Sequence, residues 1–476
     1  MPQADFVKLD ISMSQSWEIE NFLEAVDHRL HIDGVDTVEL AREYGSPLFV
    51  YSESRIRRNI ERLKRVADVV ECPVKLCYAA KAMSTLGILR AVKDADCDIE
   101  VNSGGELWKA LKAGFVGSQI IFNGTSKEIW ELDLAITNDI YAIQVDSIFE
   151  LSLIEETAAR LGKTANVSLR LVPEIRSGTH SGLQTALLTS KFGMMPEEAY
   201  AAVRKHADSQ HVNICGVHLH IGSQNPEPNV YAEAFEALFS SLLHIFKETG
   251  QKLGHINLGG GFPVRYLKDD VVELDAKQRA MLAADFEPKD AVRPAWLEVQ
   301  RAAREAGAEE LLNGLTLLLE PGRSIIADAG ICLTTVRNTK ARPTANDGTD
   351  HWLLTDAGFN ILLSMETYKW YYHLISAELA DAVHDFDYKV SGPLCDGGDV
   401  YFDIEGEGRL PEHRRLPENV EAGEILALLN CGAYSLAQAS QYNARFLPPV
   451  VLIKSDGTPS LIRRRDGFND LISSDL

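Results

Sequence analysis

The chain has 476 residues, 45% of them hydrophobic and 24% charged, an ordinary composition for a globular protein large enough for two domains. Its formal net charge of −22 would repel the phosphates of nucleic acids and of anionic membranes, so we expect neither as a partner. The N-terminus lacks the charged start and apolar core of a signal peptide, and no window approaches the roughly 18 apolar residues of a membrane span. Seven scattered cysteines without CxxC pairs predict reduced thiols, with neither a disulfide framework nor a zinc site. We therefore expect a cytoplasmic protein.

A regular alternation of elements follows a peripheral N-terminal segment, residues 1–45, which we expect to pack with the second domain. Eight apolar runs alternate mostly with stretches whose apolar residues recur at helical spacing, such as 106–114, 148–161 and 230–246. The runs lie near Val74, Asp98, Gln119, Tyr141, Asn166, Ile214, His255 and Leu315. Eight strands over about 250 residues match a closed (β/α)8 barrel, which we assign to residues 46–329. A doubly wound open sheet is the alternative.

Polar residues follow the predicted strands, where a barrel of this kind carries its active site. They are Lys81, Asn102 with Ser103, Asn123, Asp146, Arg170, His220, the glycine run 259–261, and Glu320 with Arg323. All eight strand ends have this character, which supports the barrel and predicts one site at its mouth.

Residues 330–476 have a different rhythm, with short strand-like runs separated by turn residues. The runs are ICLTTVRN, HWLLTD, YKVSGP, DVYFDI, EILALLN, PPVVLIKSDG and SLIRRR, whereas PTANDGTD and IEGEGRLPEHRRLPENVEAG have the composition of loops. We predict a second, mostly-β domain that begins near residue 330.

Lys81 follows the apolar run of the stretch VKLCYAAKAMS, which predicts a buried parallel strand, and Ser84 is placed to cap the next helix. A lysine at a strand end is most often a solvated side chain. The alternative is a Schiff-base lysine, which is desolvated enough for the pKa of its amine to fall. Motifs further along the chain decide between these interpretations.

Two loops carry the pattern of a phosphate site. Gly259, Gly260 and Gly261 follow the seventh predicted strand, and the segment EPGRS, with Glu320 and Arg323, follows the eighth. Glycines let backbone N–H groups approach an anion closely, and barrels commonly bind phosphate in these two loops. Alone, the glycines could form a flexible turn and the charged pair a salt bridge. Together they predict a bound phosphate.

His220 lies in the segment HLHIGSQ, and a histidine between apolar neighbours is usually a satisfied core residue. At a strand end that faces the same mouth as Lys81, it could instead stack on a flat ring. A lysine, a phosphate cradle, a stacking imidazole and a carboxylate for a ring nitrogen together describe a site for pyridoxal 5'-phosphate.

An ordered set of motifs extends this interpretation over nearly the whole chain: DGVDTVELAREYGSPLFVY, YAAKA, NSGGEL, HLHIGSQ, NLGGGFP, EPGRS, DAG, GPLCDGGD and GAY. With these motifs the sequence resembles the fold-type III pyridoxal-phosphate decarboxylases, the group of diaminopimelate, ornithine and arginine decarboxylases built on an alanine-racemase-like barrel. GPLCDGGD and DAGFNILLSMETYKWYYH look most similar to the branch that decarboxylates D-ornithine and D-lysine.

The resemblance implies a role for each matching residue. Lys81 would bind the cofactor covalently, His220 would stack on its ring, and Glu320 would pair with the pyridine nitrogen. The resemblance further implies that other residues surround the cofactor, mostly at its phosphate: Ser223, Gly259, Gly260, Gly261, Arg323 and Tyr434. Cys395, as general acid, and Asp396 would reach the site from the partner subunit of a homodimer with shared active sites.

Departures from the family pattern bear on the substrate. Diaminopimelate decarboxylases hold a substrate carboxylate with an arginine in an RPALY-like segment, and the matching position here is Ser364, although the tyrosine is kept as Tyr368. The family's CESGD glutamate is replaced by Asp396. Removing one partner of a buried charge pair typically costs several kcal/mol, so we expect diaminopimelate to bind poorly unless another cation compensates. Glu366, Asp396 and Asp399 would instead suit a distal ammonium, although Glu366 could equally be a solvated surface residue.

The first hypothesis from the sequence is therefore a decarboxylase of D-lysine or D-ornithine. The alternatives are a meso-diaminopimelate decarboxylase and a decarboxylase of amino-acid conjugates in siderophore biosynthesis. A racemase is disfavoured, because alanine racemases place an arginine against the pyridine nitrogen where this chain has Glu320. A catalytically silent cofactor-binding regulator is an alternative of a different class. The sequence does not decide whether residues 262–290 cover the site.

Overall fold

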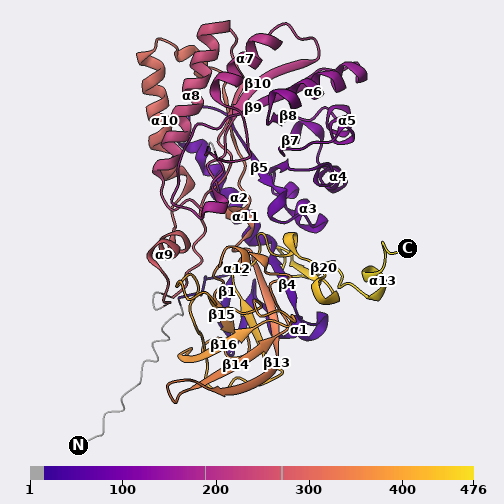
Figure 1. Ribbon diagram of the computed structural model, residues 1–476, viewed down its shortest axis with the longest axis vertical. Helices are drawn as coiled ribbons and strands as arrows, with labels where there is room; N and C mark the ends of the chain where they lie inside the picture. The colour runs from indigo at the N-terminus through magenta and orange to yellow at the C-terminus, as the bar shows by residue number, and fades with distance from the viewer. Residues whose placement is uncertain (1–15, 188, 270–271) are drawn as a thin grey trace, which may run out of the picture.

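The computed structural model describes residues 16–476 except 188 and 270–271, and Figure 1 shows a barrel with surrounding helices above a domain rich in strands. Eight strands form the barrel: β5 (Val74–Ala79), β6 (Asp98–Val101), β7 (Ile120–Phe122), β8 (Ala142–Val145), β9 (Ala165–Arg170), β10 (Val212–His218), β11 (His255–Asn257) and β12 (Thr316–Leu319). Each pairs in parallel with its neighbours, and β12 pairs with β5 to close the barrel. The eight apolar runs of the sequence are these strands, so the (β/α)8 prediction is confirmed and the open sheet is excluded.

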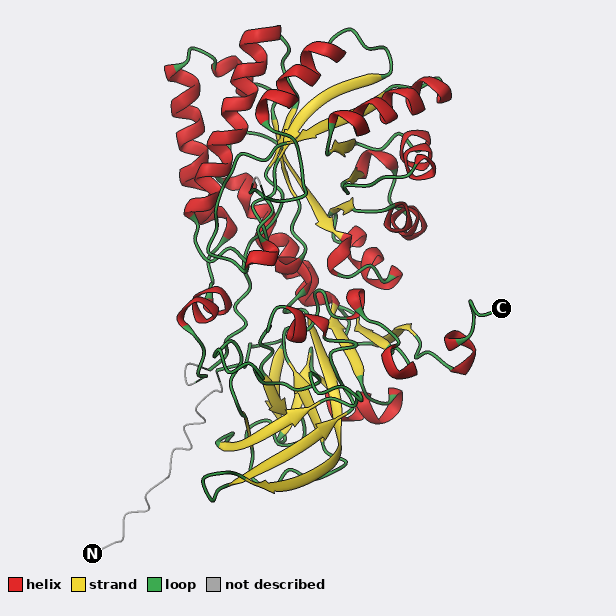
Figure 2. Ribbon diagram, viewed as in Figure 1, coloured by secondary structure: helices red, strands yellow, loops and turns green. Residues whose placement is uncertain are grey.

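The helices pack around the outside of the barrel (Figure 2). They are α2 (Glu53–Lys64), α3 (Leu86–Asp94), α4 (Gly104–Ala113), α5 (Ile129–Thr137), α6 (Ile148–Leu161), α7 (Pro196–His206), α8 (Asn229–Thr249), α10 (Pro288–Glu305) and the short α11 (Arg323–Ile326). The helix α9 (Ala276–Ala283) lies apart from them, toward the second domain (Figure 1), where Gln278 Nε2 donates to the Lys369 carbonyl at 2.6 Å. Ser103 and Ser147 cap α4 and α6 by accepting hydrogen bonds from backbone N–H groups. The expected cap at Ser84 is wrong, because α3 begins after Thr85 and the Ser84 hydroxyl accepts a hydrogen bond from Lys109 instead. None of the described helices is both long and apolar enough to cross a bilayer.

Alternation along the barrel strands separates two environments. On β9, Val167 and Leu169 join the apolar core, whereas Ser168 and Arg170 occupy the alternate positions. A barrel of this type usually fills its interior with branched apolar residues. Here polar side chains meet across the barrel near the carboxyl ends of its strands, and they form the floor of the site described below.

The second domain is built on a nine-stranded sheet. Its elements from residue 330 onward are β13 (Gly330–Pro343), β14 (Thr349–Thr355), α12 (Leu363–Thr367), β15 (Leu374–Ser376), β16 (Phe386–Ser391), β17 (Arg414–Leu416), β18 (Ile425–Leu428), β19 (Val450–Ile453), β20 (Pro459–Arg463) and α13 (Phe468–Leu471). The mostly-β character predicted for 330–476 agrees with this architecture. DVYFDI is not a strand, because only Val400 forms an isolated bridge, to Ser391. β17 lies inside a segment expected to be a loop.

Residues before the barrel contribute to the second domain. β4 (Leu48–Ser52) lies between β13 and β19 in the sheet, although the expected division at residue 46 places it with the barrel. The hairpin β1 (Leu23–Val26) and β2 (Arg29–Ile32), followed by β3 (Val35–Asp36) and α1 (Thr37–Tyr44), lies against the same domain. The Leu30 N–H donates to the Ala377 carbonyl at 2.9 Å, and the Ala380 N–H donates to the His28 carbonyl at 2.7 Å. The first 15 residues of the expected N-terminal segment lie outside the described residues.

Candidate active site

A cavity of about 260 Å³ opens at the mouth of the barrel, where its strands end. Its lining includes residues from both domains that the sequence singled out for the cofactor or substrate: Lys81, His220, Ser223, Glu320, Arg323, Tyr368 and Tyr434. The fold therefore gathers side chains from distant parts of the chain into one site, as the polar strand ends predicted.

Lys81 lies in the short helical turn Ala80–Ala82 directly after β5. Its Nζ is 3.6 Å from Glu100 Oε2 and 3.5 Å from Asn102 Oδ1. Burial acts to lower the pKa of the amine, but Glu100, then Tyr434 and Glu320, outweigh it, and the pKa lies above its ordinary value. The expectation of a lowered pKa is therefore wrong for the free lysine, because burial comes together with two nearby carboxylates.

Glu320 lies just after β12 and is held by amide donors on both oxygens. Asn257 Nδ2 donates to Oε1 at 2.7 Å, and Asn123 Nδ2 donates to Oε2 at 3.0 Å. His218 Nε2 lies 3.5 Å from Oε2. Burial disfavours the charged carboxylate, but His218, Asn257 and Lys81 outweigh it, so the pKa of Glu320 lies well below its usual range. The site thus contains a buried anion with fixed orientation.

Glu100 is a second buried carboxylate, which the sequence analysis did not identify as a site residue. Asn123 Nδ2 donates to its Oε1 at 2.8 Å and so connects it to Glu320. Burial raises the pKa of Glu100 to about 7, and Lys81 opposes that increase. The signal was present in the sequence, because alternation in the strand Asp98–Val101 places Glu100 on the opposite face from its apolar neighbours. Alternation likewise places His218 on the same face as His220, two residues further along, and the sequence analysis did not identify His218 either.

The glycine run after β11 lies directly beside the loop after β12. Gly260 N–H donates to His220 Nδ1 at 3.2 Å, which fixes the position of this imidazole. A Cβ atom on Gly260 would lie 2.5 Å from the Glu320 carbonyl oxygen. Gly261 has a φ of +95°, a conformation that favours glycine, and its Cβ atom would lie 2.4 Å from Asn225 Nδ2. Close backbone approach thus requires glycine in this loop.

Arg323 is buried, and its guanidinium is held in a fixed orientation. Its Nε donates to Ser223 Oγ at 3.1 Å, and its Nη1 donates to Tyr266 Oη at 3.0 Å. The guanidinium carbon lies 4.2 Å from the ring centroid of Trp370 and 4.8 Å from that of Tyr434. Both aromatic supports outside the predicted set, Tyr266 and Trp370, were missed because neither follows a barrel strand. Tyr266 comes from the segment 262–290, which therefore supports a lining residue of the cavity, Arg323, without lining the cavity itself.

Polar residues at three other strand ends support the mouth of the barrel. Ser103 caps α4, and Asp146 Oδ1 accepts a hydrogen bond from the Gly193 N–H at 2.9 Å. Arg170 lines the cavity with its Nη1 4.0 Å from Asp146 Oδ1 and its guanidinium carbon 4.1 Å from the Phe192 ring centroid. These contacts hold the loops that surround Lys81.

Cys395 and Asp396 do not line the cavity of their own chain. Cys395 is exposed, and its N–H donates to Asn443 Oδ1 at 2.7 Å. Asp396 Oδ2 accepts a hydrogen bond from the Tyr442 hydroxyl at 3.3 Å. Cys395, the predicted general acid, therefore lies on a surface loop of the second domain, outside the cavity of its own chain.

The far wall of the cavity includes Ser364 and Tyr368, which come from α12 and its end. Two carboxylates proposed from the sequence for a distal ammonium have other roles. Glu366 pairs with Lys369 at 3.0 Å, and the buried Asp399 accepts hydrogen bonds from the Phe359 and Leu394 N–H groups at 2.8 Å each. Asp399 therefore shapes the loop around Cys395, and its predicted contact with a substrate is wrong within this chain.

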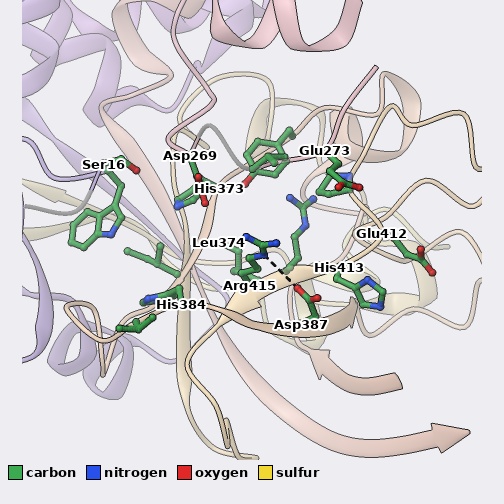
Figure 3. A pocket seen from close by; sticks show the side chains of 17 residues that line it. Ser16, Asp269, Glu273, His373, Leu374, His384, Asp387, Glu412, His413 and Arg415 are labelled. Carbon is green, nitrogen blue, oxygen red and sulfur yellow. Dashed lines mark hydrogen bonds and ion pairs between the residues drawn. The ribbon is translucent and has the colours of Figure 1, made fainter. Parts of the chain in front are cut away.

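A second cavity, of about 420 Å³, lies against the β domain (Figure 3). Figure 3 shows its histidines, His373, His384 and His413, with the Arg415–Asp387 ion pair, whose atoms are 3.5 Å apart. Burial lowers the pKa of His373 to about 3, so this imidazole is neutral at physiological pH. Among the described residues that line this cavity there is no counterpart of Lys81, so covalent chemistry with a carbonyl compound belongs to the barrel mouth.

The donor set at the mouth fits pyridoxal phosphate. A lysine amine suits its aldehyde, a buried carboxylate suits its ring nitrogen, and a guanidinium beside close-packed glycine backbone suits its phosphate. The fold and the site define a barrel enzyme that depends on this cofactor. Residues 53–327 match the family model described as pyridoxal-dependent decarboxylase, pyridoxal binding domain, which spans more than half of the chain. The protein belongs to this family of carboxy-lyases.

Comparison with known proteins identifies the members of this family that the chain resembles. The chain is 35% identical over 461 residues to the diaminopimelate decarboxylase of Methanocaldococcus jannaschii, covering 95% of this chain and 96% of that protein. It is 30% identical to the Bacillus subtilis diaminopimelate decarboxylase, covering 94% and 95%. The crystal structure of the M. jannaschii enzyme in complex with L-lysine superposes with a TM-score of 0.82 at 33% identity, covering 96% and 98%. These relatives support the diaminopimelate alternative better than the expected branch for D-ornithine and D-lysine.

Proposed function

We propose that the protein decarboxylates meso-diaminopimelate to lysine, with pyridoxal phosphate bound at the barrel mouth. The observation that carries this proposal is the convergence of Lys81, Glu320 and Arg323 in one cavity of a chain that matches diaminopimelate decarboxylases along nearly its whole length. When bound, the cofactor supplies an electron sink for the charge left on the α-carbon as carbon dioxide departs.

The residues that line or support the site would then have the following roles. Lys81 would hold the cofactor covalently through its aldehyde carbon, and its amine would give way to the amine of the substrate. Glu320 holds the proton on the ring nitrogen through its opposite charge. Arg323, Ser223 and the Gly261 N–H would hold the phosphate, and His220 would lie against the ring. Glu100 lies within reach of the Lys81 amine and has a pKa near neutrality, so it can exchange a proton with that amine.

Cys395 and Asp396 require a second copy of the chain in this scheme, because both lie on the surface, outside the cavity of their own subunit. We propose a homodimer in which Cys395 of one subunit protonates the α-carbon in the other.

Mixing two inactive variants, Lys81→Ala and Cys395→Ser, tests the shared site. Half of the dimers at equilibrium are mixed, and each contains one complete site, so the mixture should regain about a quarter of wild-type activity. Matched mixtures of each variant with itself give the baseline. No regain of activity in a mixture whose subunits are shown to exchange would contradict a shared site.

A specific observation favours a second candidate substrate, a diamino acid without a distal carboxylate, such as D-lysine or D-ornithine. The cationic side chains among the described residues of the cavity lining are Lys81, Arg170 and Arg323, and the last two pair with or stack on other groups. Ser364 offers only a hydroxyl at the far wall. A carboxylate buried there would depend on neutral donors or on the partner subunit.

Rates of carbon dioxide release, compared as kcat/KM, separate the two candidates. Meso-diaminopimelate should exceed D-lysine, D-ornithine and their L-enantiomers if a cation outside the described cavity replaces the missing guanidinium. Preference for D-lysine or D-ornithine would assign the second candidate. Ser364→Arg gives a matched check, because a guanidinium at this wall should raise the ratio of kcat/KM for diaminopimelate to that for D-lysine by about tenfold or more if the distal carboxylate lies there.

A further inference from the structure

His218 is a buried imidazole that the proposed reaction leaves without a task. It is the last residue of β10, is 1% exposed, and lines the floor of the cavity beside Glu320. Its Nε2 lies 3.5 Å from Glu320 Oε2. Among the described residues neither ring nitrogen makes a hydrogen bond of ordinary geometry, and only Nε2 has an ion-pair contact, which is the one with Glu320. A proton on Nε2 therefore faces a carboxylate oxygen, whereas a proton on Nδ1 would have no protein acceptor, and this favours the Nε2–H form.

Charged and titratable groups from every neighbouring strand act on this imidazole. Glu320, after β12, attracts its charged form, whereas Arg170 of β9 and Lys81 after β5 repel it. Burial is the largest effect and lowers the pKa of His218 below its ordinary value. Burial therefore favours the neutral form of the imidazole, and its Nε2 lies toward an anion. His220 and His255 lie nearby, and both imidazoles are also held neutral by burial.

Glu320 has few hydrogen-bond donors around its two carboxylate oxygens. Its Oε1 accepts a hydrogen bond from Asn257, and its Oε2 receives one from Asn123 and faces His218. Asn123 also donates to Glu100, so its amide is shared between two carboxylates. Asn257 and His218 are not shared with another acid, and of these two only His218 lies against Oε2, the oxygen that depends on the shared Asn123 amide. Loss of a donor to a buried charge is costly, because no water replaces it.

We propose that His218 is a positioning residue that keeps Glu320 ionised and directed at the ring nitrogen of the cofactor. This inference rests on the proposed role of Glu320. The imidazole acts through Glu320 and touches neither substrate nor carbon–carbon bond, so its effect is on the protonation of the ring.

The test uses holoenzyme variants and two readouts besides activity: the pH titration of the bound cofactor's visible absorbance, and thermal melting. His218→Leu should shift the titration midpoint by about one pH unit or more and lower kcat about tenfold or more, with KM within about threefold. His218→Gln places an amide N–H near the position of Nε2 and should restore most of both effects. It also keeps the proposal testable if the leucine variant fails to fold.

His255→Leu is the matched control, because His255 is also 1% exposed, lies on the adjacent strand β11, and like His218 has an Nε2 that makes no hydrogen bond of ordinary geometry to the described residues. It should melt at a lower temperature but keep the midpoint of the absorbance titration. Equal shifts in the His218→Leu and His255→Leu variants would overturn the inference, because they would indicate only a general loss of packing.

Glu320→Gln separates failure of this inference from failure of the proposed function. If Glu320→Gln leaves the absorbance titration and kcat unchanged, the proposed role of Glu320 is wrong and the inference falls with it. If Glu320→Gln changes both but His218→Leu changes neither, the role of Glu320 stands and the positioning role of His218 is refuted.

Discussion

Replacing Glu100 with glutamine should stabilise the cofactor-free protein relative to the wild type, and this gain in the free energy of unfolding should be larger at high pH than at low pH. The Glu100 side chain is fully buried, and its pKa is raised from 4.5 to about 7. Between these values the folded protein retains a proton that the unfolded chain has lost. The wild type therefore loses stability as the pH rises from the unfolded to the folded pKa, and glutamine removes this loss. A shift of about 2.5 pH units corresponds to roughly 3 kcal/mol at most.

Urea unfolding of the cofactor-free protein at about pH 5 and about pH 8 measures this effect through the linear dependence of unfolding free energy on denaturant. The free energy of unfolding of Glu100→Gln minus that of the wild type should increase by about 2 to 3 kcal/mol between the two pH values. Glu320→Gln is the matched opposite, because the pKa of Glu320 is lowered and its charge stabilises the fold above the unfolded pKa. It should be destabilising at about pH 8, and less so as the pH falls toward the folded pKa. A pH-independent difference for Glu100→Gln would refute the reasoning.

Three further substitutions test other parts of the site. Lys81→Ala should abolish both the visible absorbance of the covalently bound cofactor and carbon dioxide release, and a variant that kept both would exclude Lys81. Tyr266→Phe removes an acceptor from the buried guanidinium and should weaken cofactor binding about threefold to tenfold in a fluorescence titration, whereas Tyr372→Phe, whose hydroxyl has no protein partner among the described residues, should not. Gly261→Ala should lower the free energy of unfolding by more than about 1 kcal/mol, whereas Gly254→Ala, whose Cβ atom would lie 3.6 Å from its nearest neighbour, should change it less, and equal effects would contradict the close approach in the glycine loop.

The barrel could be predicted from the sequence because its signals are local. Each barrel strand is an apolar run with a polar residue at its end, and chain order alone brings these ends to one rim. β4 shows the limit, because its run looks like a barrel strand while its partners, β13 and β19, lie hundreds of residues away. The prediction of a strand at DVYFDI is wrong for a different reason. Asp399 hydrogen-bonds two backbone N–H groups, and this loop competes with the extended strand.

The site could be predicted in part, for a similar reason. Lys81, Glu320 and Arg323 were identified because they stand at strand ends, and the cavity brings them together. Glu100 lies within β6 and His218 is the last residue of β10, and their roles depend on which side chains face them across the barrel. The raised pKa of Lys81 also depends on a contact between strands, because it follows from the Glu100 carboxylate on the neighbouring strand β6.

Chemical trapping of the cofactor tests the central claim most directly. Borohydride reduction of the holoenzyme fixes a cofactor bound to a lysine as a stable secondary amine, and peptide mass spectrometry locates it. We expect the label on Lys81, and we expect it to be lost when the substrate amine is present at saturation. A label on another lysine, such as the buried Lys127 or Lys369, would contradict the site described here.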